Sequence, residues 1–145
     1  MATTTATFSL RSSDLIPSQV LSLTTSKRLY KAGSSSEGVD HLKMGRHKLS
    51  SAVAASDLFN SSALGIDKSN YMYIANASTT KSNYVEVTVI GEHIGRLYAG
   101  DFMWLPCNFD GATSDVSILA VNGESTIDYA IFHEGENLNL VSAGI

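Results

Sequence analysis

The sequence predicts an all-β fold, an antiparallel β-sandwich or jelly-roll-like domain with an extended N-terminal arm. Apolar and polar residues alternate with a period of two through most of residues 71–133, the spacing of strands with one buried face. Turn-forming residues interrupt this alternation several times. The first half of the chain is rich in Ser and Thr and lacks the regular pattern. We therefore expect an arm with short strands and a basic loop segment over residues 1–70, and an antiparallel β-domain over residues 71–145.

The predicted arm consists of short β-like segments joined by loops. Residues 6–10 and 20–24 alternate apolar and polar side chains, and Pro17 lies between them. A turn is expected there, because the proline ring fixes φ and removes a hydrogen-bond donor. Residues 33–38 (GSSSEG) have the composition of a loop. Residues 49–59 fit either a short helix or a strand with a bulge, and both alternatives stay open.

The predicted β-domain is a series of short strands separated by turns. Gly91–Glu92 and Asn122–Gly123 mark two of these turns, and Gly95 is expected at a bulge or at a close approach of two backbones. The apolar residues of the tail, residues 134–145, favour an additional edge strand. The strands themselves are expected over residues 71–76, 85–90, 93–98, 102–105, 116–121 and 126–132.

Composition limits the class of protein. The chain has 145 residues, of which 43% are hydrophobic and 17% are charged, so one domain with a real core and a weakly charged surface is expected. The single cysteine, Cys107, excludes an intrachain disulfide and has the context of a buried, inert thiol. No segment approaches the roughly 18 apolar residues of a membrane span. The N-terminus lacks the pattern of a secretory signal, so synthesis in a cytoplasm is expected.

Charge is distributed unevenly along the chain. Residues 1–81 contain nine Lys/Arg and five Asp/Glu, a net charge of +4, whereas residues 82–145 contain one Lys/Arg and nine Asp/Glu, a net charge of −8. A basic segment without interleaved aromatics, in an acidic chain, favours contact with an acidic protein neighbour over binding of a specific nucleic acid. That neighbour is a partner or another copy of the chain. The candidate partner-binding residues are Lys27, Arg28, Lys31, Lys43, Arg46 and Lys48.

The residues that carry metal or phosphate chemistry do not form recognisable motifs. The four histidines, His41, His47, His93 and His133, have no metal-ligand spacing, so no metal site is expected. Residues 108–115 resemble a calcium loop only weakly, because its fifth and twelfth positions lack an oxygen ligand, and a hairpin loop is expected instead. The glycines of residues 91–95 have no strand-to-helix context for phosphate binding.

Acidic and aromatic residues suggest one further alternative. Asp101, Glu92 and Asp128 lie near Trp104, Tyr98 and Tyr129 in the sequence, a combination found in carbohydrate-handling proteins. A carbohydrate-binding β-sandwich module that uses Trp104, Tyr98 and Asp101 is therefore one hypothesis. Because no nucleophile, base or cofactor motif is present, we expect neither an enzyme nor a cofactor.

Several segments resemble small structural proteins of tailed bacteriophages, notably of phages that infect cyanobacteria. The runs Tyr73–Thr80 (YIANASTT), Tyr84–Thr88 (YVEVT) and Gly95–Pro106 (GRLYAGDFMWLP) carry the likeness in the β-domain. Ala6–Leu15 (ATFSLRSSDL) and Leu21–Thr24 (LSLT) are similar in style to the starts of the same proteins. The resemblance implies a virion component, and length and β content fit a capsid cement or decoration protein. It transfers no catalytic residue.

The resemblance also implies a location and partners. A cement protein is made in the bacterial host cytoplasm, occupies the capsid exterior of the virion, and stabilises the lattice of the major capsid protein. We expect a homo-oligomer, with a trimer suggested by capsid symmetry. No contact with a membrane is expected. The alternative within the virion is a tail or head-tail adaptor component.

Overall fold

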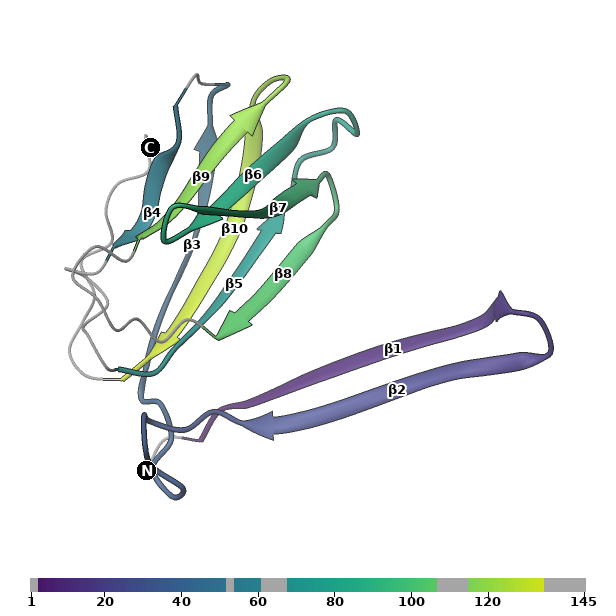
Figure 1. Ribbon diagram of the computed structural model, residues 1–145, viewed down its shortest axis with the longest axis vertical. Coiled ribbons are helices and arrows are strands. Elements are labelled where there is room, and N and C mark those ends of the chain that lie inside the picture. The colour runs from purple at the N-terminus through teal and green to yellow at the C-terminus, as the bar shows by residue number, and fades with distance from the viewer. Residues whose placement is uncertain (1–2, 52–53, 61–67, 107–114, 135–145) are drawn as a thin grey trace.

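The computed structural model describes residues 3–51, 54–60, 68–106 and 115–134 (Figure 1). These residues form β-strands joined by turns and contain no helix. The described strands are β1 (Thr5–Ile16), β2 (Gln19–Arg28), β3 (His41–Leu49), β4 (Ser56–Asn60), β5 (Asn70–Asn76), β6 (Tyr84–Val89), β7 (Glu92–Tyr98), β8 (Phe102–Pro106), β9 (Asp115–Val121) and β10 (Ser125–His133).

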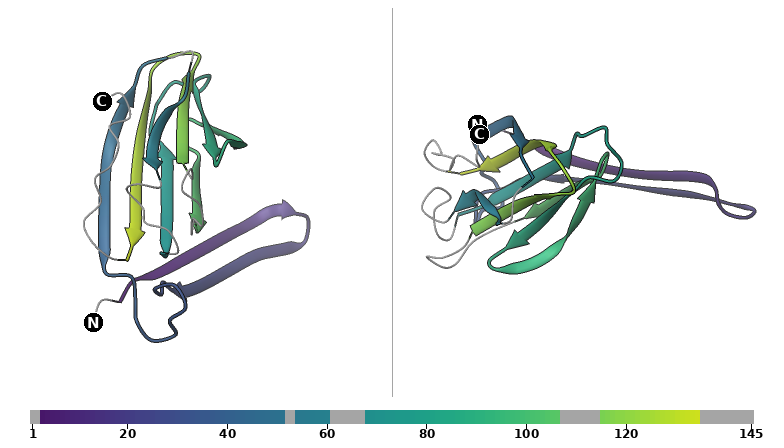
Figure 2. Two further views of the ribbon diagram at one scale, coloured as in Figure 1. Left: turned by 60° about the vertical axis from the view of Figure 1, so that its left-hand side comes forward. Right: turned by 90° about the horizontal axis from the view of Figure 1, so that it is seen from above.

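Eight of the described strands form a jelly roll. Their antiparallel pairs are nested: β6 pairs with β7, β5 with β8, β4 with β9, and β3 with β10. This nesting folds into two four-stranded sheets with the orders β3-β10-β5-β8 and β4-β9-β6-β7, which pack face to face (Figure 2). Two packed sheets with this connectivity define the double-sheet jelly roll. The predicted all-β, antiparallel fold is confirmed.

The hydrophobic core lies between the two sheets. Met72 and Ile74 of β5 alternate with half-buried tyrosines, and Val85 and Val87 of β6 alternate with polar residues, so each strand turns one set of side chains inward. The largest fully buried side chains include Leu58, Phe59, Met72, Ile74, Val85, Val87, Val116, Ile118, Ile127 and Ile131.

Two tight turns and one bulge lie at or beside the glycines that predicted them. β6 and β7 are joined by Ile90 and Gly91, both with positive φ (53° and 74°), as a type I′ hairpin requires. Asn122 and Gly123 also have positive φ and connect β9 to β10. The sequence predicted turns at Gly91–Glu92 and Asn122–Gly123. The first lies one residue earlier than predicted, because Ile90, expected to end a strand, adopts positive φ and Glu92 begins β7. In β7 the pairing shifts register beside Gly95, so the predicted bulge is present, and no atom lies within 4 Å of a Cβ placed there.

The division of the chain differs from the predicted one. β3 and β4 fall inside the segment assigned to the arm, yet β3 pairs with β10 along its whole length and β4 pairs with β9. The sandwich therefore begins at β3 rather than at residue 71. The helix considered for residues 49–59 is not formed by the described part of that segment. Residues 56–60 are instead a strand with a register shift, the other alternative that the sequence allowed.

The remaining two strands form the arm. β1 and β2 pair with each other and with no other described strand, and the hairpin projects away from the sandwich (Figures 1 and 2). Pro17 and Ser18 form its tip, as predicted for Pro17. At its base, the buried Leu29 donates its N–H to the carbonyl of Thr4 and accepts from the N–H of Val39. The arm is therefore anchored at one end only.

Candidate partner-binding surface

The arm has two chemically different faces. Residues that pair across an antiparallel ladder point to the same side, so the register assigns each side chain to a face. One side, the apolar arm face, consists of Ala6, Phe8, Leu10, Leu21 and Leu23 with Ser12, Thr25 and Lys27. The other side, the hydroxyl arm face, consists of Thr5, Thr7, Ser9, Ser22, Thr24 and Ser26 with Arg11 and Arg28.

Both arm faces are exposed to solvent, but only the apolar arm face exposes large apolar side chains. Phe8, Leu10 and Leu23 are each about half exposed, and at the tip Leu15 and Val20 are 70% and 72% exposed. On the hydroxyl arm face, by contrast, the hydroxyl groups of Thr7 and Ser26 lie 2.9 Å apart. An isolated two-stranded ribbon is at best marginally stable in water. The exposed apolar residues therefore indicate a surface that is completed by contact with another molecule.

A second apolar surface lies on the outer face of the β3-β10-β5-β8 sheet. Because Met72, Ile74 and Ile131 point into the core, their neighbours along the strands point outward. We call this surface the aromatic sheet face, and it consists of Tyr71, Tyr73, Phe102, Trp104 and Phe132 with Leu42 and Met44.

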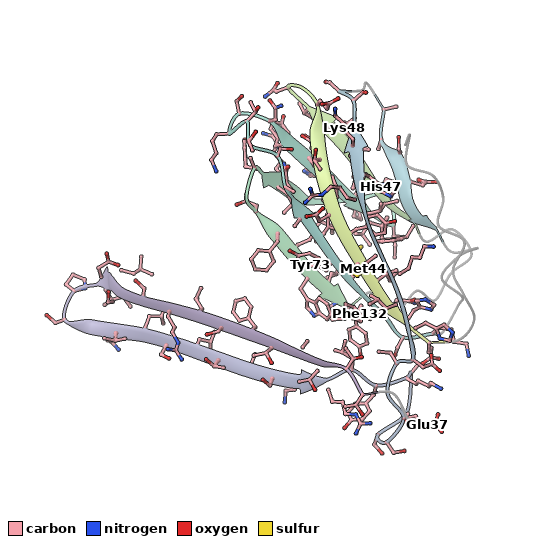
Figure 3. All side chains as sticks on the ribbon, turned by 180° about the vertical axis from the view of Figure 1, so that it is seen from behind. Glu37, Met44, His47, Lys48, Tyr73 and Phe132 are labelled. Carbon is pink, nitrogen blue, oxygen red and sulfur yellow. The ribbon has the colours of Figure 1, made fainter. Side chains whose placement is uncertain are left out.

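The rings of the aromatic sheet face pack side by side. Tyr71 and Trp104 are stacked with centroids 6.0 Å apart, Trp104 and Phe132 are 5.8 Å apart, and Tyr73 and Phe102 are 6.1 Å apart. The labelled Met44, Tyr73 and Phe132 lie on this part of the sheet (Figure 3). Met44 is 67% exposed and Phe102 is 56% exposed. A contiguous apolar patch of this kind is a feature of binding surfaces.

The two apolar surfaces face each other across a groove. The base of the arm, represented by Ala6, Phe8 and Thr25, forms one wall, and the aromatic sheet face forms the other. The groove has a volume of about 820 Å³ and is lined mostly by apolar atoms, with Lys27 and Arg28 at its polar side. Such a groove suits an apolar side chain or strand from another molecule better than a charged ligand.

The six basic residues predicted to bind partners do not form one patch. Lys27 lies on the apolar arm face and Arg28 on the hydroxyl arm face, where its guanidinium sits 5.3 Å from the ring centre of Tyr30. Lys43 lies on β3 and forms no ion pair with the residues that the structure describes. The other three residues, Lys31, Arg46 and Lys48, form ion pairs within the chain.

These ion pairs have clear partners. Arg46 binds Asp128, and Lys48 Nζ lies 3.1 Å from Glu124 Oε1. Lys31 Nζ lies 3.1 Å from Asp40 Oδ2, and Asp40 Oδ1 lies 2.7 Å from His41 Nδ1. Hydrogen bonds from His41 and then Lys31 lower the pKa of Asp40 to about 2.

Three of the four histidines lie on the β3-β10 pair. The rings of His41 and His133 are stacked 5.1 Å apart, and the buried His47 stacks on Tyr129 at 4.5 Å. Burial lowers the pKa of His47 and is the main cause of the lowered pKa of His133. His93 is exposed on β7. Within the described ranges, no three His, Cys, Asp or Glu side chains are grouped so that they could hold a metal ion.

The residues considered for carbohydrate binding are spread over different surfaces. Trp104 projects from the outer face of one sheet, and Tyr98 projects from the outer face of the other, beside Tyr84 at 5.1 Å. Asp101 accepts a hydrogen bond from the backbone N–H of Tyr98 (3.0 Å) and so stabilises the turn. Trp104 and Tyr98 therefore do not form one sugar-stacking platform.

Some predicted features lie outside the described residues. These are Cys107, the loop that follows it up to residue 114, and the tail beyond residue 134. Among the residues that are described, no helix is long and apolar enough to cross a membrane. Comparison of the sequence with models of protein families and with curated proteins finds no match.

Sequence reasoning did not identify the two apolar surfaces as sites. In Tyr71-Met72-Tyr73-Ile74, the side chains on both faces of the strand are apolar or aromatic. This pattern indicates that each face of the strand is buried or contacts another molecule. In the arm, Phe8 and Leu10 alternate with Thr7 and Ser9, but alternation alone does not say whether the apolar side meets the chain's own core. Only the separation of the arm from the sandwich shows that it does not.

Proposed function

We propose that this protein is a structural protein of a tailed phage, a capsid cement or decoration protein that binds the outside of the major-capsid lattice and stabilises it. The single observation that carries the proposal is the arm, a long amphipathic ribbon that exposes its apolar face instead of packing it on its own sandwich. A module that joins a rigid sandwich to an uncovered ribbon is suited to holding neighbours together.

The resemblance of the sequence to small phage structural proteins supplies the class of partner. A lattice presents many identical sites, so a small contact made by each copy is multiplied over the particle. The exposed tip of the arm, with Leu15, Ile16 and Val20, reaches far from the sandwich and is the part we expect to contact the capsid protein. In this proposal the protein acts by binding, as a homo-oligomer on the capsid exterior.

The first experiment counts copies in purified virions by quantitative mass spectrometry, relative to the major capsid protein. We expect a ratio near one or near a simple fraction such as one third. A ratio of a few per cent or less would instead favour the tail or head-tail adaptor, which is present in few copies. Absence from virions would contradict both assignments.

The second experiment tests stabilisation directly. Capsids prepared without the protein are compared with capsids to which it has been restored, and release of DNA is followed during heating and after osmotic shock. We expect the restored capsids to retain DNA to a higher temperature and through a stronger shock. Equal retention in the two preparations would contradict a cementing role.

A further inference from the structure

The apolar arm face and the aromatic sheet face both leave apolar side chains exposed, and within one chain they approach each other only at the base of the arm. Only the base of the arm, around Ala6 and Phe8, lines the groove beside the aromatic sheet face. Leu10, Leu21 and Leu23 lie further out along the ribbon, which extends past the sandwich (Figure 1). The outer part of the apolar arm face therefore has no surface of its own chain to cover it.

Both surfaces are apolar, and both are built on paired antiparallel strands. The apolar arm face presents side chains at every second residue of two paired strands, and the aromatic sheet face presents rings with the same strand periodicity. Two pleated surfaces of this kind interdigitate when they pack face to face. The hydroxyl arm face would then remain exposed to water, as it is in the single chain.

The arm and the sandwich carry net charges of opposite sign. Arg11 and Lys27 of the arm form no ion pair with the described residues. Asp101, which adjoins Phe102 at one end of the aromatic sheet face, also forms none there. Residues 1–32, which contain the arm, have four Lys/Arg and one Asp/Glu, a net charge of +3. Residues 33–145 have six Lys/Arg and thirteen Asp/Glu, a net charge of −7. A cationic arm is attracted to the acidic sandwich of another copy.

We propose that the apolar arm face of one copy docks on the aromatic sheet face of a second copy. Each chain then donates one arm and receives one, so the contact repeats from copy to copy and closes into a symmetric oligomer when the rotation allows it. The proposed function leaves open by which surfaces the copies join, and this contact supplies them. The contact forms in the purified full chain without a capsid.

Sedimentation equilibrium of the full chain across micromolar concentrations tests the contact from both sides. Leu10 and Leu23 lie opposite each other on the apolar arm face, and L10S/L23S removes both side chains. Ser9 and Thr24 lie opposite each other on the hydroxyl arm face, so S9A/T24A is the matched control. On the sandwich, F102S is compared with I94S, because Phe102 (56% exposed) and Ile94 (51%) are similarly exposed but lie on different sheets.

We expect the unmodified chain to self-associate, and L10S/L23S and F102S each to raise the dissociation constant by at least about tenfold. The two control variants should associate like the unmodified chain. A chain that stays monomeric at every concentration, including one whose arm folds back on its own sheet, overturns the proposal. An oligomer that is insensitive to either test variant overturns it as well. Thermal unfolding confirms that each variant keeps its fold.

Mixing the two test variants distinguishes an arm-on-sheet contact from contacts between two arms or two sheets. L10S/L23S keeps an intact sheet face and F102S keeps an intact arm, so the mixture restores one contact that neither variant can form alone. We expect heterodimers in the mixture, and their absence contradicts the proposal. Capsid binding is measured separately, so a self-associating chain that does not bind capsids would overturn only the proposed function.

Discussion

Arg46 and Asp128 lie directly opposite each other on β3 and β10, and the guanidinium donates two hydrogen bonds to the one carboxylate. Arg46 Nε lies 2.6 Å from Asp128 Oδ1, and Nη2 lies 2.9 Å from Oδ2. Two parallel hydrogen bonds fix direction as well as distance, so the pair joins β3 to β10 at one position of their backbone ladder.

The first prediction concerns Arg46→Lys. An ammonium group cannot reproduce the planar two-point contact, so we expect the urea midpoint to fall slightly at neutral pH, with the fold retained. The effect is small because both side chains are substantially exposed. Lys48→Arg is the control, because Lys48 forms a single contact with Glu124 and loses nothing geometric on replacement. An unchanged urea midpoint in Arg46→Lys would show that the two-point contact between Arg46 and Asp128 contributes no stability.

The same pair predicts a pH effect at the acid end. The hydrogen bond from Arg46 lowers the pKa of Asp128, so the folded state holds this carboxylate charged to lower pH than the unfolded state does. The stabilisation is therefore complete above the ordinary pKa of 3.8 and is lost as the pH falls through the lower folded value. Urea midpoints measured from about pH 5 downward should fall less in Asp128→Asn than in the unmodified chain.

A second prediction concerns the turn between β6 and β7. Ile90 has a φ of 53°, a conformation that costs a β-branched residue about 1 kcal/mol, and its side chain is exposed. Ile90→Asn produces Asn-Gly, the favoured type I′ pair, and should raise the free energy of unfolding by about 1 kcal/mol. Ile90→Val keeps the strain and serves as the control. A urea midpoint of Ile90→Asn at or below that of Ile90→Val would contradict the explanation.

A third prediction concerns the buried His47. Neither ring nitrogen has a hydrogen-bond partner among the described residues, and burial lowers the pKa of this side chain below its ordinary 6.5. The unfolded state therefore binds a proton at His47 that the folded state excludes. Above about pH 6.5 this difference has no effect, and below it the free energy of unfolding falls as the pH drops. His47→Leu should raise the free energy of unfolding by about 1 kcal/mol near pH 5 and reduce its pH dependence.

His133 contributes a similar dependence, because its pKa is also lowered, mainly by burial. Some acid sensitivity is therefore expected to persist in His47→Leu. His93→Gln, at an exposed position on β7, is the control for removing an imidazole outside the sandwich core. Parallel pH profiles for His47→Leu and the unmodified chain would argue against His47 as a source of acid sensitivity.

A fourth prediction compares two glycines of the sandwich. A Cβ at Gly45 would lie 2.7 Å from Tyr129 Oη, and the Tyr129 ring is held between His47 at 4.5 Å and Phe59 at 5.9 Å. Gly45→Ala must displace this ring and should cost about 1–3 kcal/mol in unfolding free energy. Gly95→Ala meets no atom within 4 Å and should cost nothing or stabilise slightly. Equal midpoints for the two variants would mean that the Tyr129 ring moves freely.

Strands with an apolar core face were predictable from the sequence, and strands with a polar core face were not. Val85 and Val87 alternate with Glu86 and Thr88, so β6 and its place in the sheet follow from the pattern. In β3 the inward residues include Gly45 and His47, while Leu42 and Met44 point outward. The pattern of β3 is therefore the reverse of a core strand, and for this part of the arm the sequence predicted only short strands and a basic loop segment.

The candidate surface was less predictable than the fold for a related reason. The basic residues stood out in the sequence because of their charge, but Lys31, Arg46 and Lys48 have partners that lie far along the chain or across a turn, which only the strand register reveals. The aromatic sheet face depends on β5, β8 and β10 becoming neighbours. No local pattern contains that information, because the three strands are separated by residues of the other sheet.

The nested order of the jelly roll also determines when its parts become available during folding. β6 and β7 are joined by two residues and can pair at once, whereas β3 and β10 lie at the two ends of the sandwich sequence. Each pair of strands that forms shortens the loop that the next pair outward in the sequence must close. We therefore expect pairing to begin with β6 and β7 and to end with β3 and β10. The aromatic sheet face is complete only after β10 has paired with β5 and β3 has paired with β10. In the proposed contact, newly made chains therefore join one another only when each sandwich is nearly closed.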